Sequence, residues 1–137
     1  MGYFTSADEV YGHVGRLFEM VVDEDEFVRA TVDSGLVVRL AQTDPEAVIV
    51  IDFPERKVTC GEAATGVPAT VKLTMTSDDS HRFWLGKLNL TLALAQGKVQ
   101  LEGSRTKALK LLPLTRSISS RYLGMLREAG RDDLLDI

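Results

Sequence analysis

The 137-residue chain contains two histidines and one cysteine, the residue types that most often bind metals or activate nucleophiles. His81 closely follows Asp78 and Asp79, which raises the idea of a metal site. A zinc site, however, needs three or four converging ligands. Acidic residues next to each other at a helix start, where they favour the positive end of the helix, usually point to solvent. We therefore predict neither a metal site nor a cofactor.

No motif in the sequence indicates a nucleophile or a phosphate loop. The Gly-x-Ser-x-Gly pattern of serine hydrolases does not occur. Gly61 and Gly66 have phosphate-loop spacing, but Val67 and Pro68 stand where lysine and serine or threonine would follow. Cys60 falls in a predicted strand and is expected to be a small buried apolar residue. These features predict a protein that is not an enzyme.

Composition and charge narrow the class of protein. Apolar residues make up 45% and charged residues 26%, as in ordinary globular domains. The net charge of −4 argues against nucleic-acid binding, which favours a basic surface. A length of 137 residues suits one domain.

Location is predicted from the same sequence. One cysteine permits no intrachain disulfide, which fits a reducing compartment. The N-terminal residues show no signal peptide, and no apolar stretch reaches the length of a membrane span. The chain ends in Leu134, Leu135, Asp136 and Ile137, unlike a peroxisomal address. We expect a cytoplasmic protein.

The apolar pattern is helical at both ends of the chain and strand-like between them. Ser6 and Glu9 have the spacing of a capping box at the start of a helix, and apolar residues from Val10 to Val21 then share one helical face. The acidic run 23–26 predicts a second short helix that Gly35 would end.

Five segments have strand character. Residues 47–53 are apolar on both faces, which predicts an interior strand. Residues 70–76 alternate, so one face should contact the core and the other water, which favours antiparallel pairing. The remaining predicted strands are 36–41, 56–60 and 98–102.

A helical insert precedes the last strand. Thr76 and Asp79 predict one cap and Asn89 a second. After the last strand, Pro113 interrupts the helical pattern, and an amphipathic stripe follows at Leu114, Ile118, Tyr122 and Leu126. The prediction is an α+β domain with N-terminal helices in 1–35, a largely antiparallel sheet with a helical insert in 36–103, and C-terminal helices in 104–137.

Four short segments, in order, resemble the sterol carrier protein-2 family. They are VKLTMTSDD at 71–79, LGKLN at 85–89, QGKVQLEG at 96–103 and ALKL at 108–111. The resemblance is sharp over residues 71–112 and looser over 36–68. Leu90 departs from the family, which usually has proline there, and residues 92–95 are smaller than its usual large apolar side chains.

The resemblance implies a five-stranded sheet with flanking helices and an apolar tunnel that binds a sterol, a fatty acid or acyl-CoA. The pocket candidates include Tyr122, whose hydroxyl is a candidate anchor for a head group. The stripe that contains it is open to three interpretations: a lid, a permanently docked helix or a dimer contact. The candidate ligand-binding residues are Phe83, Trp84, Leu88, Leu92, Leu109, Leu112, Ile118 and Tyr122.

Two functions stay open at this stage. The first is non-catalytic lipid carriage, in which basic residues near the C-terminus make transient contact with anionic membranes. The second is a degenerate family member whose filled tunnel serves protein interaction or dimerisation. The oligomeric state is not predicted. The pattern of these basic residues favours a solvated helix face, with anionic head groups or a CoA phosphate as the alternative contacts; they are Arg105, Lys107, Lys110, Arg116 and Arg121.

Overall fold

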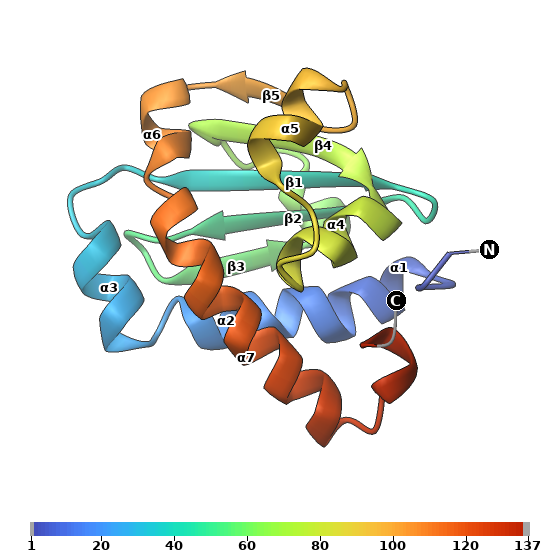
Figure 1. The fold of residues 1–137 in the computed structure, drawn as a ribbon. Coiled ribbons are helices and arrows are strands. Elements are labelled where there is room, and N and C mark those ends of the chain that lie inside the picture. The colour runs from blue at the N-terminus through green and yellow to red at the C-terminus, as the bar shows by residue number, and fades with distance from the viewer. Residues whose placement is uncertain (1, 136–137) are drawn as a thin grey trace.

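The computed structural model describes residues 2–135, so the last two residues of the C-terminal sequence considered above lie outside it. Its centre is a five-stranded sheet in the order β3-β2-β1-β4-β5 (Figure 1). The strands are β1 (Val37–Thr43), β2 (Ala47–Asp52), β3 (Lys57–Cys60), β4 (Val71–Thr76) and β5 (Gln100–Gly103).

The sheet is mixed, because β1 and β4 pair in parallel whereas the other three pairings are antiparallel. The antiparallel pairing expected from the alternation of residues 70–76 is therefore wrong for one side of β4. The connection through residues 61–70 returns the chain across the sheet and places β4 beside β1. Alternation reports which face is solvated, and a parallel strand with one open face alternates in the same way.

The first helical run follows the predicted pattern. Helix α1 (Ala7–Val10), a π-helical turn η1 (Tyr11–Gly15) and α2 (Arg16–Val21) are consecutive. The Ser6 hydroxyl accepts a hydrogen bond from the Glu9 amide, and the Glu9 carboxylate accepts one from the Thr5 amide. This arrangement satisfies amide groups that a helix start leaves without intrahelical partners.

The remaining helices also begin at polar caps in several cases. The side chains of Thr76, Asn89 and Ser104 each accept a hydrogen bond from the amide three residues later. Helix α3 ends at Thr31, four residues before the predicted stop at Gly35. The helices are α3 (Asp25–Thr31), α4 (Ser77–Trp84), α5 (Leu90–Ala95), α6 (Arg105–Leu109) and α7 (Thr115–Glu128), with 3-10 turns η2 (Gly61–Ala64), η3 (Leu112–Leu114) and η4 (Asp132–Leu134).

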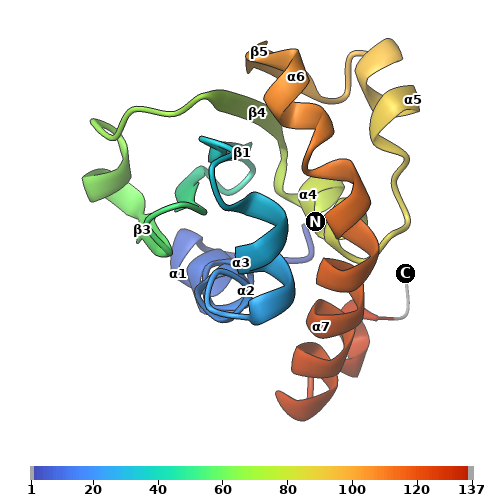
Figure 2. The same ribbon diagram turned by 90° about the vertical axis from the view of Figure 1, so that its left-hand side faces the viewer.

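The helices pack on one face of the sheet and form the core with it (Figures 1 and 2). On the other face, Arg39 donates to the carbonyls of Thr65 and Val67, which holds the connection after β3 against the sheet. No helix within residues 2–135 is long and apolar enough to span a membrane. Fully buried core residues include Leu40, Ile49, Ile51 and Leu73 from the strands and Leu17, Phe18, Trp84, Ile118, Tyr122 and Leu126 from the helices.

Gly103 is the glycine whose replacement we expect to cost the most stability. Its φ of +99° disfavours other residues, and an added Cβ would collide with the Thr70 carbonyl. We predict that Gly103→Ala lowers the free energy of unfolding by about 3 kcal/mol or more, through strain and overpacking together. Urea denaturation measures this loss.

Gly97 provides the matched control. Its φ is +75°, but an added Cβ meets no atom of the described residues within 4 Å. Gly97→Ala should therefore cost only about 1–2 kcal/mol, the conformational part of the loss. Equal losses for the two variants would contradict the close approach of Gly103 to β4.

Candidate functional site

Helix α5 stands apart from its neighbours, and the surface is hollowed on both sides of it. Asn89 begins the helix by accepting a hydrogen bond from the Leu92 amide, at 3.0 Å. Leu90 and Ala93 point into the protein and are buried, whereas Leu92 is 56% exposed. Figures 1 and 2 both show α5 separated from α6 and α7 along most of its length. Residues of α5 line a recess on each side of the helix.

Two adjoining recesses, here called the α5 groove, lie between α5 and the segment from α6 to α7. The larger has a volume of 380 Å³ and the smaller a volume of 90 Å³. Leu90, Thr91 and Leu112 line both, so the recesses are contiguous. Other lining residues are Phe83, Gly86, Leu88, Asn89, Thr115, Arg116 and Ser119 in the larger recess, and Leu94, Leu101, Arg105, Ala108 and Leu109 in the smaller.

A third recess of 490 Å³ lies between α5 and β5. It shares Leu94, Leu101 and Arg105 with the smaller recess of the α5 groove. The hollowed surface therefore continues from α7 past α5 to the last strand. Each recess is open to solvent, and their combined walls mix leucines with a few polar groups, the composition typical of small-molecule sites.

The structure places the predicted ligand-binding residues in three settings: the groove walls, the exposed surface and the core. Phe83, Leu88, Leu109 and Leu112 lie in the walls of the α5 groove. Leu92 lies on α5 but points outward and lines neither recess of the groove. The other three, Trp84, Ile118 and Tyr122, are at most 1% exposed and belong to the core beneath the groove.

Sequence reasoning did not single out several groove residues. Leu90 was noted as a departure from the family and Leu94 as part of a short helix, but neither was predicted to bind a ligand, and nor were Thr91 and Ser119. The signal that was available is the composition of α5, which is almost entirely apolar around its circumference although the helix is only six residues long. Such a helix must either be fully buried or leave leucines facing a ligand.

Cations border the groove. The side chain of Arg116 lines the larger recess, and that of Arg105 lines the smaller one and the recess beside β5. Both arginines are exposed, and neither forms an ion pair with a residue in 2–135. An arginine guanidinium binds carboxylate and phosphate groups in a bidentate manner. The groove thus combines apolar walls with positive charge at its edges.

Tyr122 and His81 form a buried hydrogen-bonded chain below the groove. The carbonyl of Leu134 can only accept, so His81 Nε2 donates to it at 2.7 Å. His81 Nδ1 then accepts from the Tyr122 hydroxyl at 2.8 Å. Burial lowers the pKa of His81 and raises the pKa of Tyr122, so both side chains are neutral near pH 7. The hydroxyl that sequence reasoning offered to a ligand is bonded to this histidine.

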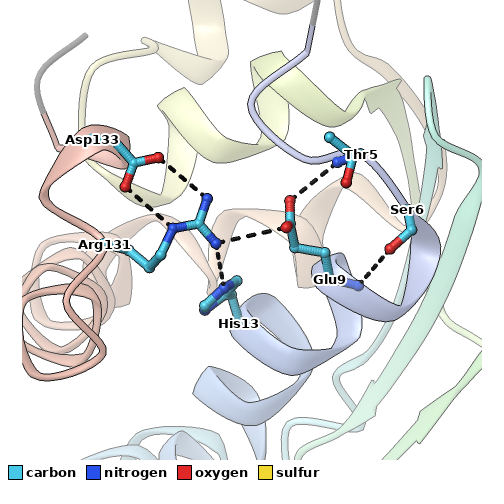
Figure 3. Close-up of polar contacts among 6 residues, drawn as sticks. All are labelled: Thr5, Ser6, Glu9, His13, Arg131 and Asp133. Carbon is cyan, nitrogen blue, oxygen red and sulfur yellow. Dashed lines mark hydrogen bonds and ion pairs between the residues drawn. The ribbon is translucent and has the colours of Figure 1, made fainter.

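A second polar cluster joins the N-terminal helix to the C-terminal turn (Figure 3). Arg131 lies between Glu9 and Asp133 and donates to His13 Nε2 at 3.3 Å. Burial, and then the nearby Arg131 charge, lower the pKa of His13. The polar groups of this cluster bond to one another, and these contacts link η4 to α1. Within residues 2–135, no group of three or more potential ligands is placed to hold a metal ion.

Comparison with known proteins relates the chain to one family. The sequence model of the SCP-2 sterol transfer family matches residues 16–116. The chain is also 30% identical, over 113 residues, to mouse "Hydroxysteroid dehydrogenase-like protein 2". That alignment covers 81% of this chain but 23% of the mouse protein, so the chain spans about a quarter of the relative's length.

Solved structures give the same relationship. The sterol carrier protein domain 2 of Helicoverpa armigera has a TM-score of 0.65 and 25% identity, covering 81% of this chain and 88% of its own. Sterol Carrier Protein-2 from Aedes aegypti, solved as a complex with the C16 fatty acid palmitate, has a TM-score of 0.55 and 21% identity. This second comparison covers 80% of this chain and 93% of the mosquito protein.

The two histidines predict a loss of stability in weak acid. Because folding lowers both pKa values from their ordinary value of 6.5, the unfolded chain binds protons more readily. The stability that neutral His13 and His81 contribute is therefore present above pH 6.5 and lost as the pH falls below it. We expect the Tm to fall between about pH 7.5 and about pH 5.5, above the range in which carboxylates titrate.

The variant His13→Gln tests this assignment, because glutamine can accept from Arg131 but does not titrate. Its Tm should fall less than that of the unmodified protein over the same pH range. A parallel fall in both proteins would mean that His13 does not contribute to the pH dependence.

Proposed function

Because the chain belongs to the SCP-2 sterol transfer family, we propose that it binds a lipid in the α5 groove and carries it without chemical change. The observation that supports this most directly is the contiguous, leucine-lined hollow beside α5. The lining residues of the α5 groove other than Ser119 fall within the residues that match the family.

The expected affinity follows from the apolar area that a lipid chain would bury. Each methylene removed from water contributes about 0.8 kcal/mol. Roughly ten buried methylenes would contribute about 8 kcal/mol, which corresponds to a Kd of about 1 μM before the costs of ordering are subtracted. A carrier benefits from this range, since a ligand bound much more tightly would dissociate slowly.

The proposed ligands are sterols, fatty acids and acyl-CoA. The mosquito relative binds palmitate, and a single acyl chain fits an elongated groove bordered by leucines. A carboxylate or phosphate head group would find Arg116 or Arg105 at the groove edge. A lipid without charge would use the apolar walls alone.

We further propose that the protein acts in the cytoplasm and has no catalytic step of its own. His13 and His81, the two histidines of the sequence, are engaged in the hydrogen bonds described above. The mouse relative carries a dehydrogenase-like name and is much longer. The same binding role would serve an enzyme elsewhere in a chain or complex by presenting a bound lipid to it.

The test is competition for the groove by a bulky side chain. Thr91 is exposed and lines both recesses of the α5 groove. We predict that Thr91→Trp raises the Kd for a fluorescent fatty acid at least about tenfold, a change of about 1.4 kcal/mol in binding free energy, because the indole occupies the groove. Fluorescence titration of the purified, delipidated protein gives the Kd.

Thr106→Trp makes the same exchange at an exposed position of α6 that lines none of the three recesses, and it should leave the Kd unchanged. If the unmodified protein binds neither fluorescent fatty acid nor fluorescent sterol, lipid carriage is rejected. If all three proteins bind equally well, the ligand lies elsewhere than in the α5 groove.

A further inference from the structure

Charge is distributed very unevenly along the chain. Residues 85–121 contain seven lysines and arginines and a single acidic residue, Glu102, so this segment carries a formal charge of +6. The whole chain has a net charge of −4, and the remaining residues therefore carry −10. The cations of the segment are Lys87, Lys98, Arg105, Lys107, Lys110, Arg116 and Arg121.

The charges are separated in space as well as in sequence. Figures 1 and 2 show β5, α5 and α6 together at one end of the molecule. The acidic first turns of α1 and α3 and the acidic turn η4 lie on the same face of the sheet but away from that end, toward the β3 edge. The protein is thus an electric dipole whose positive end carries α5 and the groove.

Some cations of the segment already have structural partners. Lys107 donates to the Ser34 carbonyl, and Arg121 pairs with Glu24. Four others are exposed and form no ion pair with any residue in 2–135; they are Lys98, Arg105, Lys110 and Arg116. These four charges are available to a partner.

Two leucines project from the same end. Leu92 on α5 is 56% exposed and Leu109 on α6 is 62% exposed, and Leu109 also lines the α5 groove. A single exposed leucine is unremarkable. Here, the two exposed leucines lie on neighbouring helices, α5 and α6, in the segment that carries the unpaired cations, and one of them lines the groove. The α5–α6 face is defined by these two leucines and by Lys98, Arg105, Lys110 and Arg116.

We propose that the α5–α6 face docks on an anionic lipid bilayer. The four cations meet the phosphate and carboxylate groups of the lipid heads, and Leu92 and Leu109 enter the boundary between heads and acyl chains. The acidic remainder of the protein is repelled by the same surface, so the dipole orients the molecule with its groove toward the membrane. This inference rests on the proposed function, because docking in this orientation would give a lipid a direct path into the groove.

The charge pattern favours a bilayer over an acidic protein as the partner. The exposed leucines continue directly into the apolar groove wall at Leu109, so contact with acyl chains is continuous from the surface inward. A bilayer offers anionic groups and apolar chains at adjacent depths, which matches cations beside projecting leucines.

Co-sedimentation with lipid vesicles tests the proposal. The full chain should bind vesicles of phosphatidylcholine mixed with phosphatidylserine, bind phosphatidylcholine vesicles much more weakly, and dissociate as salt is raised. Each basic residue near an anionic surface strengthens binding roughly fivefold. The double variant Lys98→Glu with Lys110→Glu should therefore lower the partition coefficient at least about 20-fold.

The matched control is Arg56→Glu with Lys57→Glu, which makes the same charge change at exposed positions at the end of the β2–β3 turn and the start of β3. This control should bind the mixed vesicles nearly as well as the unmodified protein. The variant Leu92→Ser with Leu109→Ser should bind them roughly tenfold more weakly, with the salt dependence retained.

Lys98 and Lys110 line none of the recesses beside α5, so their variant should keep its Kd for the fluorescent fatty acid. Vesicle binding by a protein that binds neither fluorescent fatty acid nor fluorescent sterol would reject the proposed function and leave the docking face standing. Fatty-acid binding without vesicle binding, or equal losses in the variant and its charge control, would overturn the docking face. Absence of vesicle binding would also direct attention to an acidic protein as the partner of these cations.

Discussion

The hydrogen-bonded chain from Tyr122 through His81 to the Leu134 carbonyl is the constraint on which the helical layer depends. It ties α7 to α4 and α4 to the C-terminal turn, deep inside the protein. A buried polar group without a partner is costly, so these three segments have one favourable arrangement. That arrangement fixes which side of α7 faces the core and keeps Ile118 and Leu126 in it.

The groove lies beside helix α5, which the Tyr122–His81–Leu134 hydrogen bonds do not include. Helix α7 is fixed on α4, and Pro113 lies in the 3-10 turn that redirects the polypeptide between α6 and α7. Helix α5 is attached through the buried side chains of Leu90 and Ala93, the partly buried Leu94, and hydrogen bonds from the Lys98 and Val99 amides to the Ala93 carbonyl. The recesses between α5 and the segment from α6 to α7 are bordered by two of the unpaired cations, Arg105 and Arg116.

Local signals were sufficient for much of this fold. The caps at Ser6, Thr76 and Asn89 involve residues three apart, so their spacing alone located three helix starts. The residue pattern predicted five strands, and the family resemblance implied the same five-stranded sheet. The parallel pairing of β1 with β4 depends on how the chain returns across the sheet, which alternation does not encode. The bond between His81 and Tyr122 joins residues 41 positions apart, and burial of both is a property of the assembled helices.

The central claim is that a lipid chain lies in the α5 groove and leaves the core undisturbed. NMR with labelled leucine methyl groups tests it directly, in the delipidated protein saturated with unlabelled palmitate. The account predicts intermolecular contacts between the acyl chain and the methyls of Leu90, Leu94 and Leu112, and none with those of the core residues Leu17 and Leu40. Contacts with Leu17 or Leu40, or the absence of any contact with the three groove leucines, would contradict it.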